Sequence, residues 1–318
     1  MDNEKVMVTV RQYIKYFLSL KLLLLISIVN VGFAQDSEQQ TSIITNDVAP
    51  EQEYLTPSQI FVASLKEGMI VGYFNQYWVA VDKIDINGYY RKIVKIEDNN
   101  SFVVQDFFTD TNKKQSDPVL IHNIYELKQV GFLRSIEGPY VTWYKNGQKQ
   151  YQSFYNEKGV LDGVIQAWYD SGILKLKGQY DNGKKAGQWT EWHANGRVKS
   201  QVDYINNVLS GSYKKWYENG QQHTLGSYKN GLLNGLWIAW GSKGEKVSEG
   251  EYSANHRIGL WTYYAEGKKW AEGNYINDLQ DGIWTYWKED GSKDKEIVYQ
   301  KGVKIKESHF NKKSDSNG

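Results

Sequence analysis

The side chains that most often carry catalysis or hold metal ions are few in this sequence and are not grouped. Cysteine is absent, which excludes disulfides, thiolate metal sites and cysteine nucleophiles. A zinc enzyme would need a spacing such as HExxH, which places two imidazoles on one helix face. The histidines follow no such spacing: His122, His193, His223, His256 and His309. We therefore expect no metal and no cofactor, and we expect these histidines at exposed positions on strands or turns.

Motifs that bind phosphate or activate a nucleophile are also missing. The sequence has no GxSxG elbow, no Walker GxxxxGK[ST] loop and no GxGxxG between a strand and a helix. The carboxylates Glu191, Glu218 and Glu249 recur loosely with the repeat described below, whereas catalysis needs one asymmetric group of residues. We therefore do not expect an enzyme. A catalytic site of unusual type in the N-terminal region is kept as a third hypothesis, which hydrolysis of any panel substrate would support.

Aromatic side chains are the remaining residues that could bind a ligand. The chain has 12 Trp, 24 Tyr and 10 Phe, far more than a disordered protein would carry. Either they form the core of a repeat fold, or one row is exposed as a ladder for sugar rings or for side chains of a partner protein. The candidate binding-surface aromatics are Trp143, Trp168, Trp192, Trp216, Trp240, Tyr263, Trp270 and Trp287. Two of them, Tyr263 and Trp270, lie off the regular repeat positions.

A repeat must position these rings. Seven glycines recur at intervals of 25, 24, 24, 24, 24 and 23 residues: Gly138, Gly163, Gly187, Gly211, Gly235, Gly259 and Gly282. Counting each as position 0, position 2 is usually aromatic: Tyr140, Ile165, Trp189, Tyr213, Trp237, Trp261 and Trp284. Position 5 is always aromatic: Trp143, Trp168, Trp192, Trp216, Trp240, Tyr264 and Trp287. A tyrosine closes every unit. Such a period indicates tandem supersecondary units that bury their apolar faces against one another.

Each unit reads as two strands joined by a turn such as Asn219-Gly220. Asn-Gly is typical of a two-residue type I′ turn, in which both residues have positive φ. Two residues that face each other across the hairpin then have position numbers that add up to 17, so Trp237 lies opposite Gly250. In the sixth unit, which is one residue shorter, a three-residue turn keeps Trp261 opposite Gly273. We expect each ring to lie over the glycine that it faces, because a glycine in a strand leaves space for it. About fourteen strands should form an antiparallel meander with an aromatic row on each face.

The rest of the chain divides by composition. Residues 1–34 read as a signal peptide, residues 35–59 as a flexible polar linker, and residues 60–136 as a β-rich leader, a divergent relative of the repeat. Seven hairpin repeats occupy residues 137–305, and residues 306–318 are expected to be a disordered tail. The expected fold class is all-β: an elongated, twisted antiparallel meander of tandem 24-residue hairpins, preceded by a small β-rich region.

The signal-peptide interpretation depends on three features. Arg11, Lys15 and Lys21 precede the short apolar core at 22–31, and Gly32-Phe33-Ala34 supplies small residues for cleavage near Ala34. The protein would then be exported and periplasmic, cell-surface or secreted. The alternative is an uncleaved membrane anchor, since the apolar stretch is close to the length of a membrane span. The net charge of +1 provides no field that would attract nucleic acid, so no nucleic-acid partner is expected.

The repeats resemble a known family. The units "GQWTEWHANGRVKSQVDYINN", "GSYKKWYENGQQHTLGSYKNG" and "GLWIAWGSKGEKVSEGEYSAN" are similar to the bacterial variant of the MORN (membrane occupation and recognition nexus) repeat, and they resemble the YwqK family of antitoxins in toxin–antitoxin systems. The likeness covers a little over half of the chain. It implies a repetitive β-sheet and a binding role, and it brings no catalytic residues to transfer.

Two binding functions follow as hypotheses. The first is a noncatalytic, exported repeat scaffold that binds a protein partner, in the manner of an antitoxin or immunity protein, with a toxin as one such partner. The second is a carbohydrate-binding module that uses its aromatic rows for envelope or extracellular glycans. The exposure of the two aromatic rows indicates which surface binds. An exposed row favours binding by that face of the sheet, and two covered rows favour binding by the loops.

Overall fold

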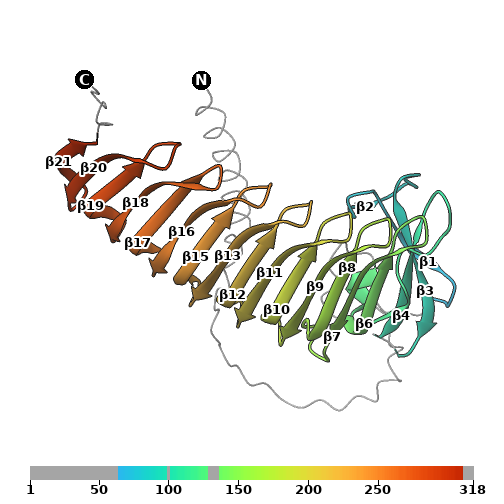
Figure 1. Cartoon of the computed structure of the whole chain (residues 1–318). Helices are drawn as coiled ribbons and strands as arrows, with labels where there is room; N and C mark the ends of the chain where they lie inside the picture. The colour runs from blue at the N-terminus through green and yellow to red at the C-terminus, as the bar shows by residue number, and fades with distance from the viewer. Residues whose placement is uncertain (1–63, 99–100, 128–135, 311–318) are drawn as a thin grey trace, which may run out of the picture. The chain divides into compact units, whose positions relative to one another are not determined.

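The structure, a computed structural model, describes residues 64–98, 101–127 and 136–310. The predicted signal peptide and the predicted linker lie outside these ranges, as do the residues after 310. The described chain is nearly all β and forms one open antiparallel meander (Figure 1), as the sequence predicts. Among the described residues, no helix is long and apolar enough to cross a membrane.

The leader forms a small sheet with its own core. Its elements are β1 (Ile70–Phe74), β2 (Ala80–Val81), β3 (Tyr89–Ile96), β4 (Phe102–Phe108), β5 (Val119–Ile121) and a short 3-10 helix (Ile124–Leu127). The alternating pattern of β4 buries every second side chain, as expected for a strand with one face on a core. The core comprises Leu65, Val71, Ile93, Phe102, Val104, Val119, Ile121, Leu127 and Ile136. Ile136 belongs to the first repeat strand and pairs with Ile121, so the two sheets are continuous.

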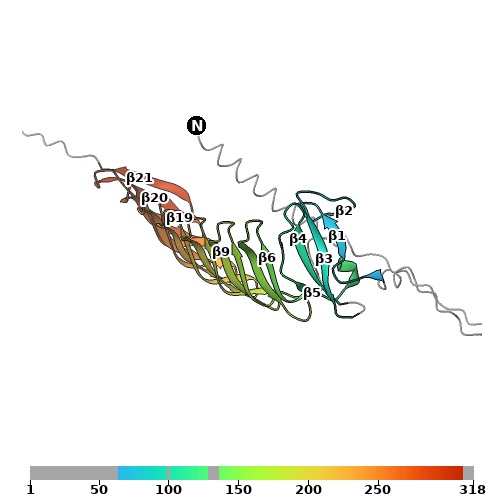
Figure 2. The same ribbon diagram turned by 90° about the vertical axis from the view of Figure 1, so that its right-hand side faces the viewer.

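The repeats supply the remaining strands, which follow one another in chain order (Figures 1 and 2). They are β6 (Ile136–Trp143), β7 (Lys149–Tyr155), β8 (Gly163–Trp168), β9 (Leu174–Asp181), β10 (Lys184–Trp192), β11 (Val198–Ile205), β12 (Val208–Trp216), β13 (Gln222–Lys229), β14 (Leu232–Leu233), β15 (Gly235–Trp240), β16 (Lys246–Ser253), β17 (His256–Ala265), β18 (Lys268–Ile276), β19 (Leu279–Trp287), β20 (Lys293–Gln300) and β21 (Val303–His309). Because β21 pairs with β20 as far as His309, residues 306–309 are strand and not disordered tail.

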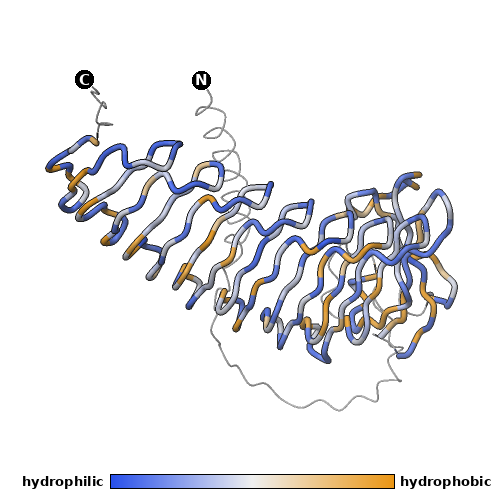
Figure 3. Tube along the Cα trace, in the orientation of Figure 1, coloured by the Kyte–Doolittle hydropathy of each residue, from blue (hydrophilic) through white to orange (hydrophobic). Residues whose placement is uncertain are grey.

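The predicted register is confirmed. Trp237 pairs with Gly250 and Trp261 with Gly273. In the third unit Trp189 pairs with Val202, again as the sum of 17 requires. The hydrophilic turns of the hairpins line one edge of the repeat sheet in Figure 3.

The predicted turn types are wrong, although the register is right. Within a unit the chain makes a three-residue turn: Gly220 N donates to Tyr217 O, and Tyr217 N donates to Gln221 O. Only Gly220 has positive φ, at 90°. A one-residue bulge at His223 compensates, so the outer pairs keep their register. The sixth unit has the opposite arrangement, a two-residue turn with positive φ at both Glu266 and Gly267.

Type I′ turns occur instead between units. Asn182-Gly183, Asn206-Asn207 and Asn230-Gly231 each have positive φ at both residues, and each joins two directly paired strand ends. This turn matches the twist of tightly paired strands. Successive units are therefore joined as closely as the two strands within a unit, which makes the meander continuous.

The glycine that each indole covers also differs from the prediction. A Cβ added at Gly250 would overlap the indole of Trp261, which belongs to the next unit, and not that of its own partner Trp237. The same relation joins Gly178 to Trp189, Gly226 to Trp237, and Gly273 to Trp284. Each indole therefore ties one hairpin to the preceding hairpin. This arrangement stabilises the contact between units, where a repeat protein gains its cooperativity.

The position 2 rings and the closing tyrosines form one aromatic ladder. Trp261 lies between Tyr252 and Tyr275 at centroid distances of 5.1 and 6.3 Å, with the rings nearly perpendicular. Trp284 continues the series at 5.0 Å from Tyr275. Edge-to-face pairs of this kind are favourable beyond their buried area. Trp189, Trp261 and Trp284 are 5%, 5% and 2% exposed and Ile165 is also buried, whereas Tyr140, Tyr213 and Trp237 are half-buried, so the row is core in four of the seven units. We call the side of the sheet that carries it the ladder face.

Candidate functional site

The position 5 row, which supplied six of the eight candidate residues, is half-buried along its length. Those six are Trp143, Trp168, Trp192, Trp216, Trp240 and Trp287. Lysines cover several rings: Lys149 Nζ lies 5.2 Å from the centroid of Trp168, and Lys269 Nζ lies 5.1 Å from that of Trp287. Each lysine comes from the preceding unit, so the cation–π contact also joins two hairpins. These contacts therefore fasten hairpin to hairpin and cover part of the rings of Trp168 and Trp287. Trp192, Trp216 and Trp240 are half-buried, and no ring of the row is fully exposed.

Backbone atoms of the same row are bound by the neighbouring unit. Tyr144, Tyr169 and Tyr217 donate their hydroxyls to the carbonyls of the next position 5 residue at 2.9, 2.8 and 2.9 Å. His193 takes the same place in the third unit, with Nε2 3.1 Å from Trp216 O. His193 therefore has a structural role at a repeat position, which the sequence analysis missed. The tyrosines at position 6 of three other units were the signal.

The ladder face carries two further positions that change from unit to unit. Position 4 holds Thr142, Ala167, Glu191, Lys215, Ala239, Tyr263 and Tyr286. The bulge residue, at position 12 and at position 11 in the shorter sixth unit, is in turn Gln150, Lys175, Lys199, His223, Val247, Trp270 and Asp294. Side chains at the two positions meet: Thr142 donates to Gln150 at 3.1 Å, and Lys199 pairs with Glu191 at 3.0 Å. We call these residues the position 4/12 stripe.

In the last two units the stripe becomes aromatic. Tyr263 lies 6.0 Å from Trp270, and Trp270 lies 6.3 Å from Tyr286, measured between ring centroids. Tyr263 also stacks on Trp261 and Trp284 of the ladder. Trp270 is 44% exposed. The structure therefore brings together Tyr263 and Trp270, the two candidates that lie off the regular positions, and adds Tyr286, which the sequence analysis did not select.

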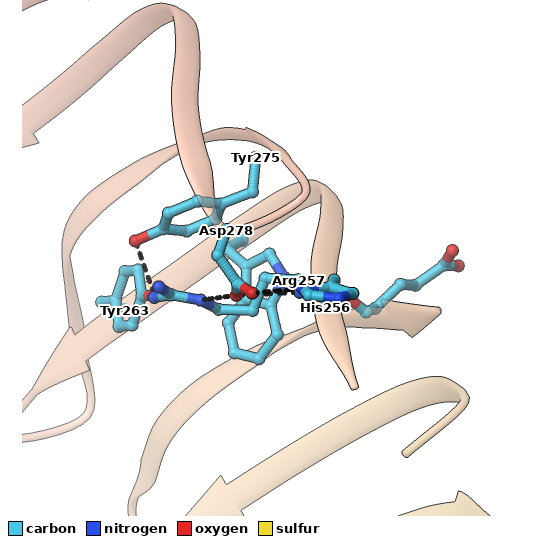
Figure 4. A network of polar contacts seen from close by, with 7 residues as sticks. His256, Arg257, Tyr263, Tyr275 and Asp278 are labelled. Atoms are coloured by element: carbon cyan, nitrogen blue, oxygen red, sulfur yellow. Dashed lines mark hydrogen bonds and ion pairs between the residues drawn. The ribbon is translucent and has the colours of Figure 1, made fainter. Parts of the chain in front are cut away.

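A polar network fixes the hydroxyl end of Tyr263 (Figure 4). Arg257 Nη1 lies 3.3 Å from Tyr263 OH, which lies 3.2 Å from Tyr275 OH. The Arg257 guanidinium lies over the Tyr275 ring at 4.0 Å and donates from Nε to Asp278 at 3.0 Å. His256 Nδ1 contacts the other oxygen of Asp278 at 2.9 Å. Burial raises the pKa of Tyr275, so its phenol stays neutral at ordinary pH.

The network predicts a pH-dependent contribution to stability. Hydrogen bonds from the Arg257 backbone and side chain, then from His256, lower the pKa of Asp278 to about 2. A depressed carboxyl pKa contributes stability that is present above the unfolded value of about 4 and is lost as pH falls through the folded value. We expect Asp278→Asn to lower the free energy of unfolding at pH 7 by less than about 1 kcal/mol, because the pair is partly exposed, and to lower the melting temperature accordingly.

Thermal melts between pH 7 and pH 2 measure this effect. The difference in melting temperature between the native protein and Asp278→Asn should become smaller from about pH 4 downward. Glu289→Gln, at an exposed carboxylate, is the control and should leave the melting temperature unchanged at pH 7. A difference in melting temperature that stays constant from pH 7 to pH 2 would contradict the role assigned to the Asp278 carboxylate.

The described residues offer a contact surface on the ladder face. Within 64–98, 101–127 and 136–310, no group of three or more His, Asp or Glu side chains is placed to hold a metal ion. What the ladder face presents is an exposed aromatic group on a fixed support, with charged and polar pairs along the same stripe. Such a surface can bind a partner by shape and desolvation.

Comparison with known proteins agrees with the hairpin architecture. No curated protein matches the chain. The family model of the MORN repeat variant matches three tandem segments, residues 136–157, 161–182 and 185–206. These segments coincide with the first three hairpins, and the four hairpins that follow repeat their register. The chain is therefore a β-hairpin repeat scaffold that carries tandem MORN repeat variants.

Proposed function

We propose that this protein is a noncatalytic scaffold that binds a protein partner through the ladder face, with Tyr263, Trp270 and Tyr286 as the anchor. The observation that carries the proposal is the exposure of Trp270, 44%, within a cluster whose other rings are held by the ladder and the Arg257 network. A large ring that is already ordered loses little entropy on binding, and Trp, Tyr and Arg dominate binding hot spots.

The variation within the repeat supports a protein as the partner. Position 0 is always glycine, the closing residue is always tyrosine and position 2 is aromatic in six of the seven units because these residues hold the fold, whereas the pair of residues at positions 4 and 12 differs from unit to unit. The stripe places an ion pair at Glu191–Lys199 and an aromatic group at Tyr263–Trp270 on one face. A surface with different chemistry at each step suits the irregular surface of one protein better than a uniform polymer.

The location and the identity of the partner are further parts of the proposal. Export rests on the basic residues and the apolar core of residues 1–34. An antitoxin or immunity role, with a toxin as partner, rests on the resemblance of the repeats to the YwqK family. Either role would have the scaffold bind one protein tightly, and an exported scaffold would meet that protein in the periplasm, at the cell surface or outside the cell.

Replacing Trp270 with alanine is the direct test. We expect the affinity for the partner to fall by about 2 kcal/mol, or roughly thirtyfold, because the change truncates the anchor. Folding should be little affected, since the ring is substantially exposed. A photo-crosslinker placed at the stripe position Val247 in the native host would capture the partner for mass spectrometry, and calorimetry would then measure both affinities.

The control for this test is Tyr77→Ala. Tyr77 is 75% exposed and lies in the leader between β1 and β2, outside the repeats, so its removal should leave binding unchanged. Equal binding by Trp270→Ala and the native protein would exclude the proposed anchor. Dependence on Tyr77 instead would move the interface to the leader.

A further inference from the structure

The ladder face carries a group of lysines in its second to fourth units. The four lysines are Lys175, Lys185, Lys199 and Lys215. Three of them belong to the position 4/12 stripe, and the fourth, Lys185, lies over the same face with its Nζ 4.2 Å from the centroid of Trp189. In these units the stripe has one carboxylate, Glu191. Four positive charges therefore lie beside one negative charge, although the net charge of the whole chain is only +1.

One of these four lysines is neutralised by a carboxylate. Lys199 pairs with Glu191 at 3.0 Å. Lys175 and Lys185 lie over aromatic rings at 5.4 and 4.2 Å, a contact that leaves the positive charge in place. Lys215 forms no ion pair among the residues that the structure describes. Three positive charges therefore remain to attract a partner.

The charged groups of the ladder face around the anchor are paired instead. Three ion pairs lie there: Arg257–Asp278 at 3.0 Å, Lys295–Glu307 at 3.1 Å and Lys288–Asp294 at 4.0 Å. Val247, which is 42% exposed, adds apolar surface to the stripe beside the anchor. The ladder face therefore has a basic region in the second to fourth units and a nearly neutral, aromatic region in the last units.

The two regions are close enough to belong to one interface. Lys175 lies on β9, Lys215 on β12 and Trp270 on β18 (Figure 1). Neighbouring strands are about 4.8 Å apart, so the five strand spacings between β12 and β18 amount to roughly 24 Å. An interface of standard size covers about 800 Å² of each partner and is roughly 30 Å across. One folded partner can therefore contact both regions.

We infer that the protein partner presents acidic side chains to the second to fourth units and apolar side chains to the anchor. This inference rests on the proposed function and adds the charge of the partner and the direction in which it lies along the scaffold. Carboxylates of the partner pair with Lys175 and Lys215. A chain of phosphates fits less well, because a continuous row would also meet the carboxylate of Glu191, whereas a folded protein can place single carboxylates at the lysines.

The test uses the full chain and a library of random peptides displayed on phage. Peptides of about 12 residues are long enough to reach from β12 to β18 when extended. We expect the enriched peptides to contain more Asp and Glu than the unselected library, next to apolar residues. The most enriched peptide is then synthesised, and surface plasmon resonance measures its association and dissociation rates. A single-stranded DNA oligomer and phosphatidylglycerol vesicles serve as comparison probes.

Two double variants with the same net charge test the face that binds. Lys175→Gln/Lys215→Gln removes two charges from the stripe. Lys177→Gln/Lys214→Gln removes two exposed charges from the same strands, β9 and β12, at positions that alternate to the opposite face. We expect the first variant to lower the association rate of the peptide about tenfold at low ionic strength, and by less in high salt. The second variant should leave the rate nearly unchanged.

The anchor is tested separately in the same assay. Trp270→Ala should act mainly on the dissociation rate, because it removes a contact made after the charges have steered the encounter. An effect of the stripe lysines without an effect of Trp270 would overturn the anchor and leave this inference standing. Three results would overturn the inference: a selection that enriches no acidic peptide, equal effects of the two double variants, or tighter, equally lysine-dependent binding of the DNA oligomer or the vesicles.

Discussion

Replacing Asp106 with alanine is expected to lower the free energy of unfolding by about 3–5 kcal/mol, because it removes the carboxylate that pairs with the buried guanidinium of Arg91. Arg91 donates to Asp106 through Nε and Nη2 at 2.8 and 2.9 Å, and the two side chains are 2% and 3% exposed. The same guanidinium donates to Glu126 O at 2.8 Å, which ties the 3-10 helix to the sheet. Urea unfolding of the native and variant proteins gives the difference directly.

Two controls separate a buried charge from general damage at this site. Glu97→Ala breaks the exposed Lys95–Glu97 pair, whose side chains are 59% and 41% exposed, and should cost less than about 1 kcal/mol. The double variant Arg91→Met/Asp106→Leu replaces both charges by apolar groups and should be more stable than Asp106→Ala alone. If Asp106→Ala costs no more than Glu97→Ala, the ion pair does not hold the leader together.

The period and register of the repeat could be predicted because they rest on residues with few alternatives. All seven position 0 glycines have positive φ, between 62° and 108°, a conformation that side chains other than glycine adopt with difficulty. The turns were harder to predict. An Asn-Gly pair suits a type I′ turn, but it suits equally well a three-residue turn in which only the glycine has positive φ. The β-bulge that accompanies the three-residue turn distinguishes it from the two-residue turn, but no residue type in the sequence indicates this bulge.

The candidate site was harder to predict than the fold. Whether a position 5 ring is free depends on the residue that the preceding hairpin places over it, such as Lys149 over Trp168, and that contact lies between units. Trp270 stands out in the sequence because it lies off the regular aromatic positions of the repeat. Its exposure has a simple cause: it occupies the bulge position, where the strand pairing is interrupted and the side chain cannot join the ladder.

The partner of each glycine could have been read from the sequence. At position 15, which becomes position 14 in the shorter sixth unit, the units have Ser153, Gly178, Val202, Gly226, Gly250, Gly273 and Ile297. Every glycine in this series is followed, in the next unit, by tryptophan at position 2. Val202 is followed by Tyr213, and Ser153 by Ile165. No such rule relates the glycines to position 2 of their own unit, where Ile165, Tyr213 and Trp237 all face glycine. The register within one hairpin does not reveal this relation, because each glycine lies between position 2 of its own unit and position 2 of the next unit.

Replacing Gly250 with alanine is expected to destabilise the repeat sheet by about 3 kcal/mol, because the new methyl group would overlap the indole of Trp261. The φ of Gly250 is not positive, so alanine fits the backbone and the cost is purely steric. The indole cannot move aside easily, because Tyr252 and Tyr275 pack against it and its Nε1 donates to Glu251 O at 3.1 Å. Urea unfolding followed by tryptophan fluorescence measures the loss.

A rescue identifies the steric cause. The pair Val202–Tyr213 shows that a branched side chain is accommodated when the next unit has tyrosine at position 2. Gly250→Val/Trp261→Tyr copies that pair and should be more stable than Gly250→Val alone. Gly259→Ala is the contrast: it has open space but a φ of 62°, so its cost of about 1–2 kcal/mol is backbone strain, which Trp261→Tyr should not relieve. If Trp261→Tyr relieves both substitutions, or neither, then the indole is not what reserves the space at Gly250.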